Sequence, residues 1–357
     1  MKRVLQAGRA LAAISVLVYH LTDIMTKAGE AAPPVLRQIS ANGMLGVSFF
    51  FVLSGFIILM AHELDIGCPD RLAHYGWRRF ARIYPIYWIC LTVYLLVSVL
   101  QTGLAEFQWD FAQLFSAYGL WHVVPQDRPL PLRVSWTLFY EIQFYAVFAT
   151  LIVNRRLGTM AMAAWAVWIV GSCVAMQTGY MALSNEVCCL QFLAGMGAYW
   201  LYKHARRDRW PLLLSGGLFF IAMYAVAGAY DDLADFDSRF RDNVTMVSLA
   251  FAALLAGLVM AEDAGRIKVP GWLALIGNAS YAIYLVHGPL LSSYVRLVRK
   301  FGLEQIAGFW PLYLAGVAGG IGAGCLVHIY VEKPLLARLR TQWIRHSENS
   351  MAASTAL

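Results

Sequence analysis

The sequence predicts an all-α, polytopic integral membrane protein with about ten transmembrane helices. Three observations predict this class: 60% of the 357 residues are hydrophobic, only 14% are charged, and apolar runs recur along the whole chain. A soluble domain carries about 25% charged residues, so this chain has too few charges to cover a surface exposed to water. The mean hydropathy of +0.58 agrees.

A helix that spans a bilayer needs about 20 mostly apolar residues. By this rule, ten segments are predicted to span the membrane, and the one at 187–202 is short. They are residues 10–27, 43–62, 82–101, 137–154, 159–177, 187–202, 211–229, 243–261, 272–294 and 309–331.

The first segment could be mistaken for a signal peptide. In a signal peptide a charged stretch is followed by an uninterrupted apolar stretch, whereas here Arg9 lies between the two. The apolar run also continues through His20 without a clear cleavage site. We therefore expect an uncleaved membrane helix.

The orientation follows from Lys and Arg, which favour cytoplasmic loops. Most of these residues are cytoplasmic if the N-terminus is inside, and an even number of spans then places both termini there. The cluster of Arg296, Arg299 and Lys300 breaks the pattern. We expect a multi-pass protein of the bacterial inner membrane, with a transmembrane domain at 1–345 and a disordered cytoplasmic tail at 346–357.

The net charge of +7 does not indicate nucleic-acid binding, because the charges lie in short loops between apolar runs. The six cysteines are scattered without metal-ligand spacing to histidine, so we interpret them as packing residues and expect no metal. There is no Walker A motif, which argues against nucleotide hydrolysis.

Arg9 and His20 lie eleven residues apart in the first span. In a helix this spacing puts them on one face, about 20° out of line and about 16 Å apart along the axis. An ionisable group within a span is a functional-site hypothesis by default. The alternatives are that Arg9 snorkels to the interface and that His20 makes an interhelical hydrogen bond.

Two further ionisable residues are expected near the depth of His20. Counted from the span boundaries, Glu141 and His287 fall at roughly the same level, about 8–10 Å below the outer boundary. Two imidazoles and a carboxylate at one depth could form a proton-transfer set in which the carboxylate supports a histidine base.

A basic cluster is predicted at the cytoplasmic end of the third span. Arg79 and Arg82 share a helix face, and Arg9 and Glu332 lie at the same end of the bundle. Arginine side chains match the geometry of phosphate groups, so the cluster could bind a phosphate-rich cytosolic donor. The alternative is an ordinary positive-inside signal.

Small residues in two spans predict close helix packing. Gly316, Gly320 and Gly324 form a stripe at four-residue spacing, and Ser54 precedes Gly55 in the second span. The Ser54 hydroxyl could also serve the site.

Six motifs follow one another along essentially the whole chain. They are LQAGRALAA (5–13) with His20, GVSFFFVLSGF (46–56), RFARIYP (79–85), SWTLFYE (135–141), SYAIYLVH (280–287) and VEKP (331–334). In this order they resemble the membrane-bound acyltransferase family 3, and most closely its exopolysaccharide O-acetyltransferases. One difference is Arg9-Ala10, where the family often has Arg-Gly.

This resemblance implies transfer of an acyl group, usually acetyl, from cytosolic acyl-CoA to a hydroxyl of a cell-surface carbohydrate or its lipid-linked precursor. Acetyl-CoA would be a co-substrate, and no bound cofactor is expected. Arg9 and His20 would be the essential pair, and Arg79 and Arg82 would serve the donor. Combined with the residue analysis, this makes His20, Glu141 and His287 the candidate catalytic residues, with Ser54, Ser135 and Glu332 in supporting roles.

Two other interpretations remain open at this point. A transporter or flippase for a polysaccharide intermediate would also use buried ionisable residues. A non-catalytic membrane subunit of a polysaccharide-synthesis complex would need Arg9 and His20 only for stability or assembly. Direct transfer and an acyl-enzyme intermediate are equally compatible with the motifs.

Overall fold

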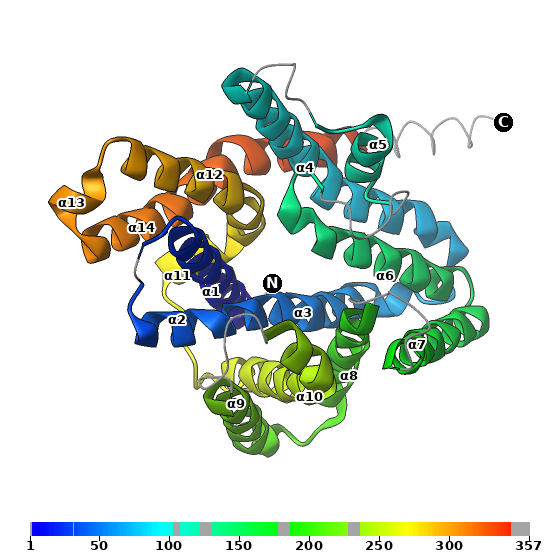
Figure 1. Ribbon diagram of the computed structural model, residues 1–357. Coiled ribbons are helices and arrows are strands. Elements are labelled where there is room, and N and C mark those ends of the chain that lie inside the picture. The colour runs from blue at the N-terminus through cyan, green and yellow to red at the C-terminus, as the bar shows by residue number, and fades with distance from the viewer. Residues whose placement is uncertain are drawn as a thin grey trace.

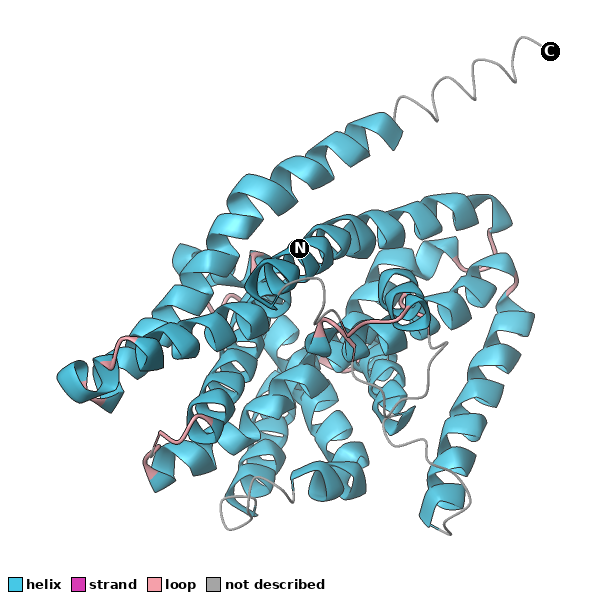
Figure 2. Ribbon diagram, turned by 45° about the horizontal axis from the view of Figure 1, so that its top comes forward, coloured by secondary structure: helices cyan, strands magenta, loops and turns pink. Residues whose placement is uncertain are grey.

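A computed structural model describes residues 2–30, 32–102, 108–121, 130–177, 186–227 and 236–343. This part of the chain is built from helices joined by short loops, with no β-strand (Figure 2). The helices are α1 Arg3–Lys27, α2 Pro34–Ala41, α3 Leu45–His62, α4 Leu72–Thr102, α5 Phe111–Gly119, α6 Trp136–Val153, α7 Arg155–Gln177, α8 Leu190–His204, α9 Trp210–Ala227, α10 Phe236–Asp263, α11 Gly271–Asn278, α12 Ser280–Lys300, α13 Leu303–Ala307 and α14 Phe309–Val327.

The all-α membrane class is confirmed. Within the described residues, seven helical stretches are long and apolar enough to cross a bilayer; they contain α1, α3, α4, α6, α9, α10 and α14. The other three predicted spans coincide with α7, α8 and the α11–α12 pair, and α8 is only 15 residues long. The count of ten spans stays a prediction, and the predicted tail at 346–357 lies outside the described residues.

The predicted span at 272–294 consists of two helices. It breaks at Ala279 into α11 and α12, and α12 continues to Lys300. The break makes Ser280 the first residue of α12. A Cβ on Gly277 of α11 would collide with the Gln6 backbone, so α11 packs tightly against α1.

Helices α1 and α3 lie at the centre of the bundle (Figure 1). On one side α12 and α14 pack against α1, on another α8 and α10 pack against α3, and α4 and α6 lie on a third. The central helices therefore contact all three groups, and a side chain on α1 or α3 can meet residues from distant parts of the sequence.

Glycines bring the helix backbones together, as the small-residue motifs predicted. A Cβ on Gly55 of α3 would meet the backbone of Phe192 in α8, and a Cβ on Gly195 would meet the backbone of Val52. On α14, Gly316 and Gly320 face leucines of α1, and Gly324 faces Ile283 of α12. Close backbone approach of this kind drives helix association in lipid.

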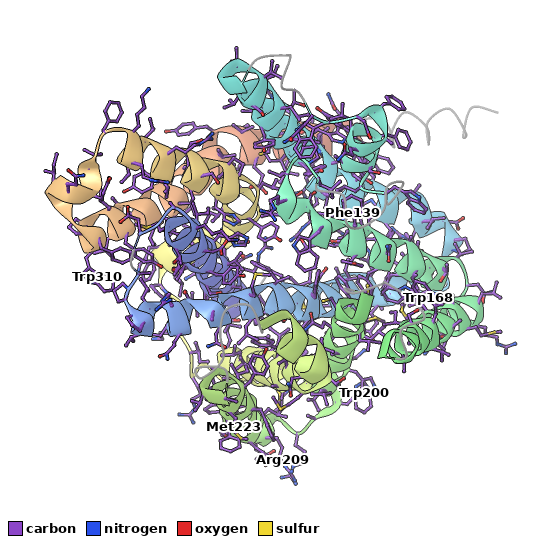
Figure 3. All side chains as sticks on the ribbon, viewed as in Figure 1. Phe139, Trp168, Trp200, Arg209, Met223 and Trp310 are labelled. Atoms are coloured by element: carbon purple, nitrogen blue, oxygen red, sulfur yellow. The ribbon has the colours of Figure 1, made fainter. Side chains whose placement is uncertain are left out.

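The outer surface of the bundle is apolar. Trp168, Trp200, Met223 and Trp310 project outward, with exposed fractions between 49% and 59%, whereas Phe139 is buried (Figure 3). A soluble protein would not expose large apolar side chains all round its surface. This pattern agrees with a surface in contact with lipid.

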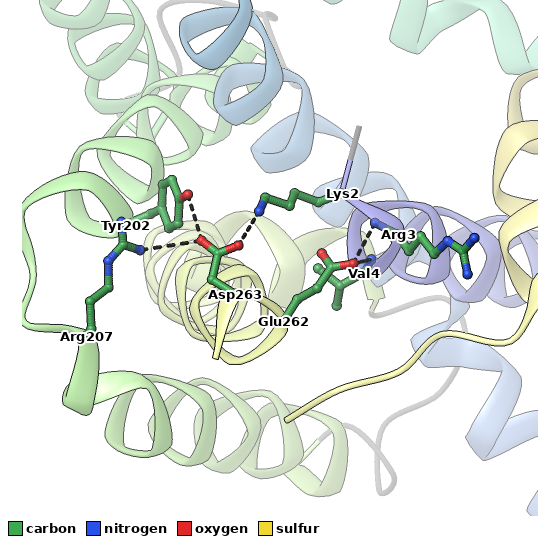
Figure 4. A network of polar contacts seen from close by, with 7 residues as sticks. All are labelled: Lys2, Arg3, Val4, Tyr202, Arg207, Glu262 and Asp263. Carbon is green, nitrogen blue, oxygen red and sulfur yellow. Dashed lines mark hydrogen bonds and ion pairs between the residues drawn. The ribbon is translucent and has the colours of Figure 1, made fainter. Parts of the chain in front are cut away.

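A polar network holds the start of α1 against the end of α10 (Figure 4). The N-terminus of α1 lacks a side-chain cap from its own N-cap residue. The Glu262 carboxylate instead accepts hydrogen bonds from the backbone N–H groups of Arg3 at 2.8 Å and Val4 at 3.4 Å. A carboxylate at this position also complements the helix dipole. The beginning of the helix that carries Arg9 and His20 is therefore fixed.

Asp263 extends the network. Its carboxylate bonds Lys2, which raises the pKa of that amine above its ordinary value. The same carboxylate accepts a hydrogen bond from Tyr202 at 2.9 Å and pairs with Arg207 at 3.7 Å. The loop after α8 is thereby linked to the same helix ends.

Candidate active site

Most of the predicted site residues line one of two cavities. We call the first the arginine cavity; it has a volume of about 80 Å³ and receives residues from α1, α3, α4, α6 and α12. Its polar and charged lining residues are Arg9, Ser54, Arg79, Arg82, Thr137, Glu141, Tyr145, Ser280, Tyr281 and Tyr284.

The second cavity, which we call the histidine cavity, is much larger, at about 1310 Å³. His20 lines it together with residues of α4, α12 and α14, and Val47 lines both cavities. Its other titratable and aromatic lining residues include Tyr19, Asp23, Lys27, Cys90, Tyr94, Arg133, Trp136, Tyr294 and Arg296. The two cavities thus meet at one residue of α3.

Arg9 is 7% exposed and donates a hydrogen bond from Nε to the Ser280 hydroxyl, 3.0 Å away. A snorkelling arginine would extend its guanidinium to the water interface. Arg9 instead turns into the arginine cavity, so the structure favours a role in the site over snorkelling.

Arg79 is also buried, at 8% exposure. Its guanidinium carbon lies 5.8 Å from the ring centre of Tyr75 and 5.6 Å from that of Tyr145. Arg82, one helical turn further along α4, lines the same cavity. The structure therefore brings Arg9, Arg79 and Arg82 together, as the sequence predicted.

Glu141 lies in the arginine cavity and not beside the histidines, so the expected set of three at one depth is not formed. Its carboxylate accepts hydrogen bonds from the Ser54 hydroxyl, at 3.2 Å, and from Tyr145. Ser54 therefore supports the site through a hydrogen bond, in addition to the packing made by Gly55.

The reason for the difference is the position at which α6 begins. The residues just before it, such as Leu132 and Val134, are already buried. The Tyr284 hydroxyl bonds both Thr137, at 3.0 Å, and the Val134 carbonyl, at 3.1 Å. The contact puts Tyr284 and Thr137 at one level. His287 lies three residues beyond Tyr284, and Glu141 lies four residues beyond Thr137 in the opposite direction, because the two helices are antiparallel. At the rise of an α-helix, Glu141 is therefore about 10 Å from the level of His287.

His20 and His287 are in direct contact, which agrees with the common depth predicted for them. Their rings meet edge to face with centres 5.0 Å apart. Each ring bonds through Nδ1 to a carbonyl one turn earlier in its own helix: His20 to Val16 at 3.0 Å and His287 to Ile283 at 3.1 Å.

These contacts determine the tautomer of both imidazole rings. A carbonyl oxygen can only accept, so Nδ1 carries the hydrogen and, in the neutral ring, Nε2 carries the lone pair. No hydrogen-bond donor reaches His287 Nε2 among the described residues. The His20 ring is therefore oriented by the Val16 carbonyl and not by Glu141, the partner expected from the sequence.

Two supporting residues line neither cavity in the described part of the chain. Ser135 is fully buried at the start of α6. Glu332 is 6% exposed and accepts from His328 Nδ1 at 2.7 Å, within a π-helical turn at His328–Glu332. The contact with His328 fits a structural role for Glu332.

Several residues of the arginine cavity and its surroundings were not predicted. Tyr145 follows Glu141 by four residues, and this spacing on a helix could have revealed the pair. Ser280 belongs to one of the sequence motifs, but the sequence did not indicate that it would contact Arg9. His62 contacts Arg79, and Asp65 contacts His62. They stand at the end of α3 and just after it, where a polar residue is ordinary.

No group of three His, Cys, Asp or Glu residues with the geometry of a metal site occurs in the part of the chain that the structure describes. Cys68, Cys90 and Cys325 are free thiols.

Comparison with known proteins identifies the family. A family model for an acyltransferase domain, of the acyltransferase 3 type, matches residues 3–329. The exopolysaccharide production protein ExoZ of Rhizobium meliloti (strain 1021) is 30% identical over 315 residues, which cover 84% of this chain and 92% of that protein. No solved structure matches the chain.

More distant relatives have related names. The acyltransferase MdmB of Streptomyces mycarofaciens is 26% identical, over 93% of this chain and 90% of that protein. The peptidoglycan O-acetyltransferase OatA of Listeria monocytogenes is 24% identical over 80% of this chain, but the match covers only 48% of OatA. The family match, the relatives and the apolar helices lead to one conclusion: the chain belongs to the acyltransferase 3 family and is a membrane O-acyltransferase.

Proposed function

We propose that this protein transfers an acyl group, in the first instance acetyl, from cytosolic acyl-CoA to a hydroxyl of a cell-surface polysaccharide or its lipid-linked precursor. It would do so in a bacterial inner membrane with both termini in the cytoplasm. The observation that carries the proposal is the position of His20, with Nδ1 held by Val16 and its ring against His287, in a cavity that adjoins the arginine cavity.

The arginine cavity supplies the donor site in this proposal. Three arginines and one carboxylate leave it with a net positive lining, and arginine is suited to phosphate recognition. A cavity of about 80 Å³ holds only part of a donor molecule. We therefore assign it the phosphate end of the pantetheine arm, with the thioester directed past Val47 to His20.

The histidine cavity is the acceptor site. It is large enough for several sugar units and carries hydrogen-bonding and aromatic side chains. Such groups suit a carbohydrate, which presents many hydroxyls and apolar ring faces.

His20 acts as the general base. Its Nε2 takes the proton of the acceptor hydroxyl while the hydroxyl oxygen attacks the thioester carbonyl. An ester C–O bond forms, the C–S bond breaks, and the proton passes from His20 to the departing CoA thiolate. In the alternative route, Nε2 first accepts the acyl group and the acceptor hydroxyl then removes it. Glu141 holds Tyr145 and Ser54 beside the donor in either case.

The test uses membranes that contain the protein and acetyl-CoA labelled in the acetyl group. Label should enter a base-labile carbohydrate fraction, and it should not do so in membranes without the protein. Absence of label from every carbohydrate fraction, with the protein folded and acetyl-CoA intact, would reject the proposal. Label on the protein itself in the absence of acceptor would select the acyl-enzyme route.

A further inference from the structure

The last residue of α3, His62, is completely buried, with both ring nitrogens engaged. Nδ1 lies 2.7 Å from Asp65 Oδ2, and Nε2 lies 3.2 Å from a terminal nitrogen of Arg79. The ring also packs edge to face against Tyr75, with the ring centres 4.9 Å apart. His62 therefore joins the end of α3 to the guanidinium of α4.

The hydrogen-bond roles of His62 follow from its neighbours. A guanidinium can only donate, so Nε2 must carry the lone pair and accept from Arg79. Nδ1 then carries the hydrogen and donates it to the Asp65 carboxylate, which fixes this tautomer. In this arrangement the neutral imidazole of His62 links the Asp65 carboxylate to the buried Arg79 guanidinium by two hydrogen bonds.

Arg79 is held on more than one side. Its faces lie near the rings of Tyr75 and Tyr145, and one terminal nitrogen is bound to His62. It lines the arginine cavity, and no acceptor reaches its Nε among the described residues. A buried cation is stable only when it is paired and hydrogen bonded, so this side of the guanidinium is suited to an anionic ligand.

We propose that His62, oriented by Asp65, is a positioning residue that fixes Arg79 for a phosphate group of the donor. The proposal rests on the proposed function, in which the arginine cavity takes acyl-CoA. His62 and Asp65 touch neither donor nor acceptor and act only through Arg79. A structural role at the end of α3 would instead change stability and leave donor affinity as it is.

The experiment measures the Kd for CoA, together with kcat and KM for acetyl-CoA, on the full chain in detergent. His62→Leu removes the acceptor for Arg79 and should raise the Kd and KM about tenfold with kcat within twofold. His62→Gln places an amide oxygen near the former Nε2 and should restore both constants to within threefold of the parent. His74→Gln, in the same helix as Arg79 and in contact with Trp343, is the matched control and should change nothing.

The double variant decides whether His62 acts through Arg79. Arg79→Ala alone should weaken CoA binding, and adding His62→Leu should weaken it no further, because residues that act as a unit are not additive. Independent, additive effects would overturn the proposal. So would an unchanged Kd in His62→Leu when Arg79→Ala raises it. An unchanged Kd in Arg79→Ala would instead reject the donor site itself.

Asp65 provides a second variant if His62→Leu fails to fold. Its side chain is 21% exposed, so Asp65→Ala is tolerated more easily. It should raise the Kd for CoA severalfold in the parent protein and have no effect when Arg79 is already alanine. An unchanged Kd in the parent would overturn the proposal without any use of His62→Leu.

Discussion

Arg9 Nε donates a hydrogen bond to Ser280 Oγ over 3.0 Å, and this contact joins α1 to the first residue of α12 inside the arginine cavity. The contact lies next to Ala279, the residue that separates α11 from α12. The hydrogen bond thus fixes one of the three arginines proposed to bind the donor.

Replacing Ser280 by alanine should loosen Arg9. A hydrogen bond to a charged group contributes about 1.5–3 kcal/mol, so we expect kcat/KM for acetyl-CoA to fall roughly tenfold or more. Ser280→Thr keeps the hydroxyl and should retain most activity. Ser215→Ala removes an exposed serine hydroxyl on α9 that bonds the Leu212 carbonyl and is the control. Wild-type kinetics in Ser280→Ala would show that the contact is dispensable.

His20→Ala should abolish most of the transfer and leave donor binding intact. Loss of a general base typically costs about 10²–10⁴ in rate. Donor binding should persist because His20 lines the histidine cavity and not the cavity lined by Arg9, Arg79 and Arg82. The measurement is acetyl transfer in membranes beside the Kd for CoA, with exposed His204→Ala as the control. Transfer at the parental rate would exclude His20 as the base.

Glu262→Ala should destabilise the start of α1. The carboxylate caps two backbone N–H groups, and loss of a cap costs about 1 kcal/mol. We expect a lower midpoint of thermal unfolding in detergent, and a smaller decrease for Glu262→Gln, whose amide oxygen can still accept. If both variants unfolded at the parental temperature, the contact in Figure 4 would contribute nothing measurable to stability.

The helices and the cluster of Arg9, Arg79 and Arg82 could be predicted because each depends on local information. Apolar runs of sufficient length must be helical in lipid, and charges at one end of several spans must meet at one end of the bundle. The shared depth of His20 and His287 followed from the same counting, since both spans run in one direction and both residues lie at a similar distance from their ends. The contact between the two rings could not be predicted, because the sequence does not show which helices are neighbours.

The position of Glu141 could not be predicted in this way. Counting residues assumes that every span begins at the same plane, whereas α6 begins among buried residues and is set deeper by Tyr284. His62 was missed for a related reason. The importance of a histidine at a helix end depends on which arginine of another helix it meets, and no spacing along the chain contains that information.

Gly324→Ala should damage both stability and catalysis. A Cβ there would lie 2.6 Å from Ile283 Cα and 2.9 Å from Ile283 Cβ, and the backbone of α12 cannot easily move aside. Overpacking of this kind costs about 1–3 kcal/mol. Because the Ile283 carbonyl holds His287 Nδ1, the displacement would reach the histidine pair, so acetyl transfer should fall together with the midpoint of thermal unfolding.

Gly322 provides the matched control on the same helix. A Cβ there meets no atom within 4 Å, and alanine favours a helix interior over glycine by about 1 kcal/mol. Gly322→Ala should therefore unfold at or above the parental temperature with parental transfer. The prediction fails if the two variants behave alike, because the loss at Gly324 would then come from removing a glycine and not from the contact between α14 and α12.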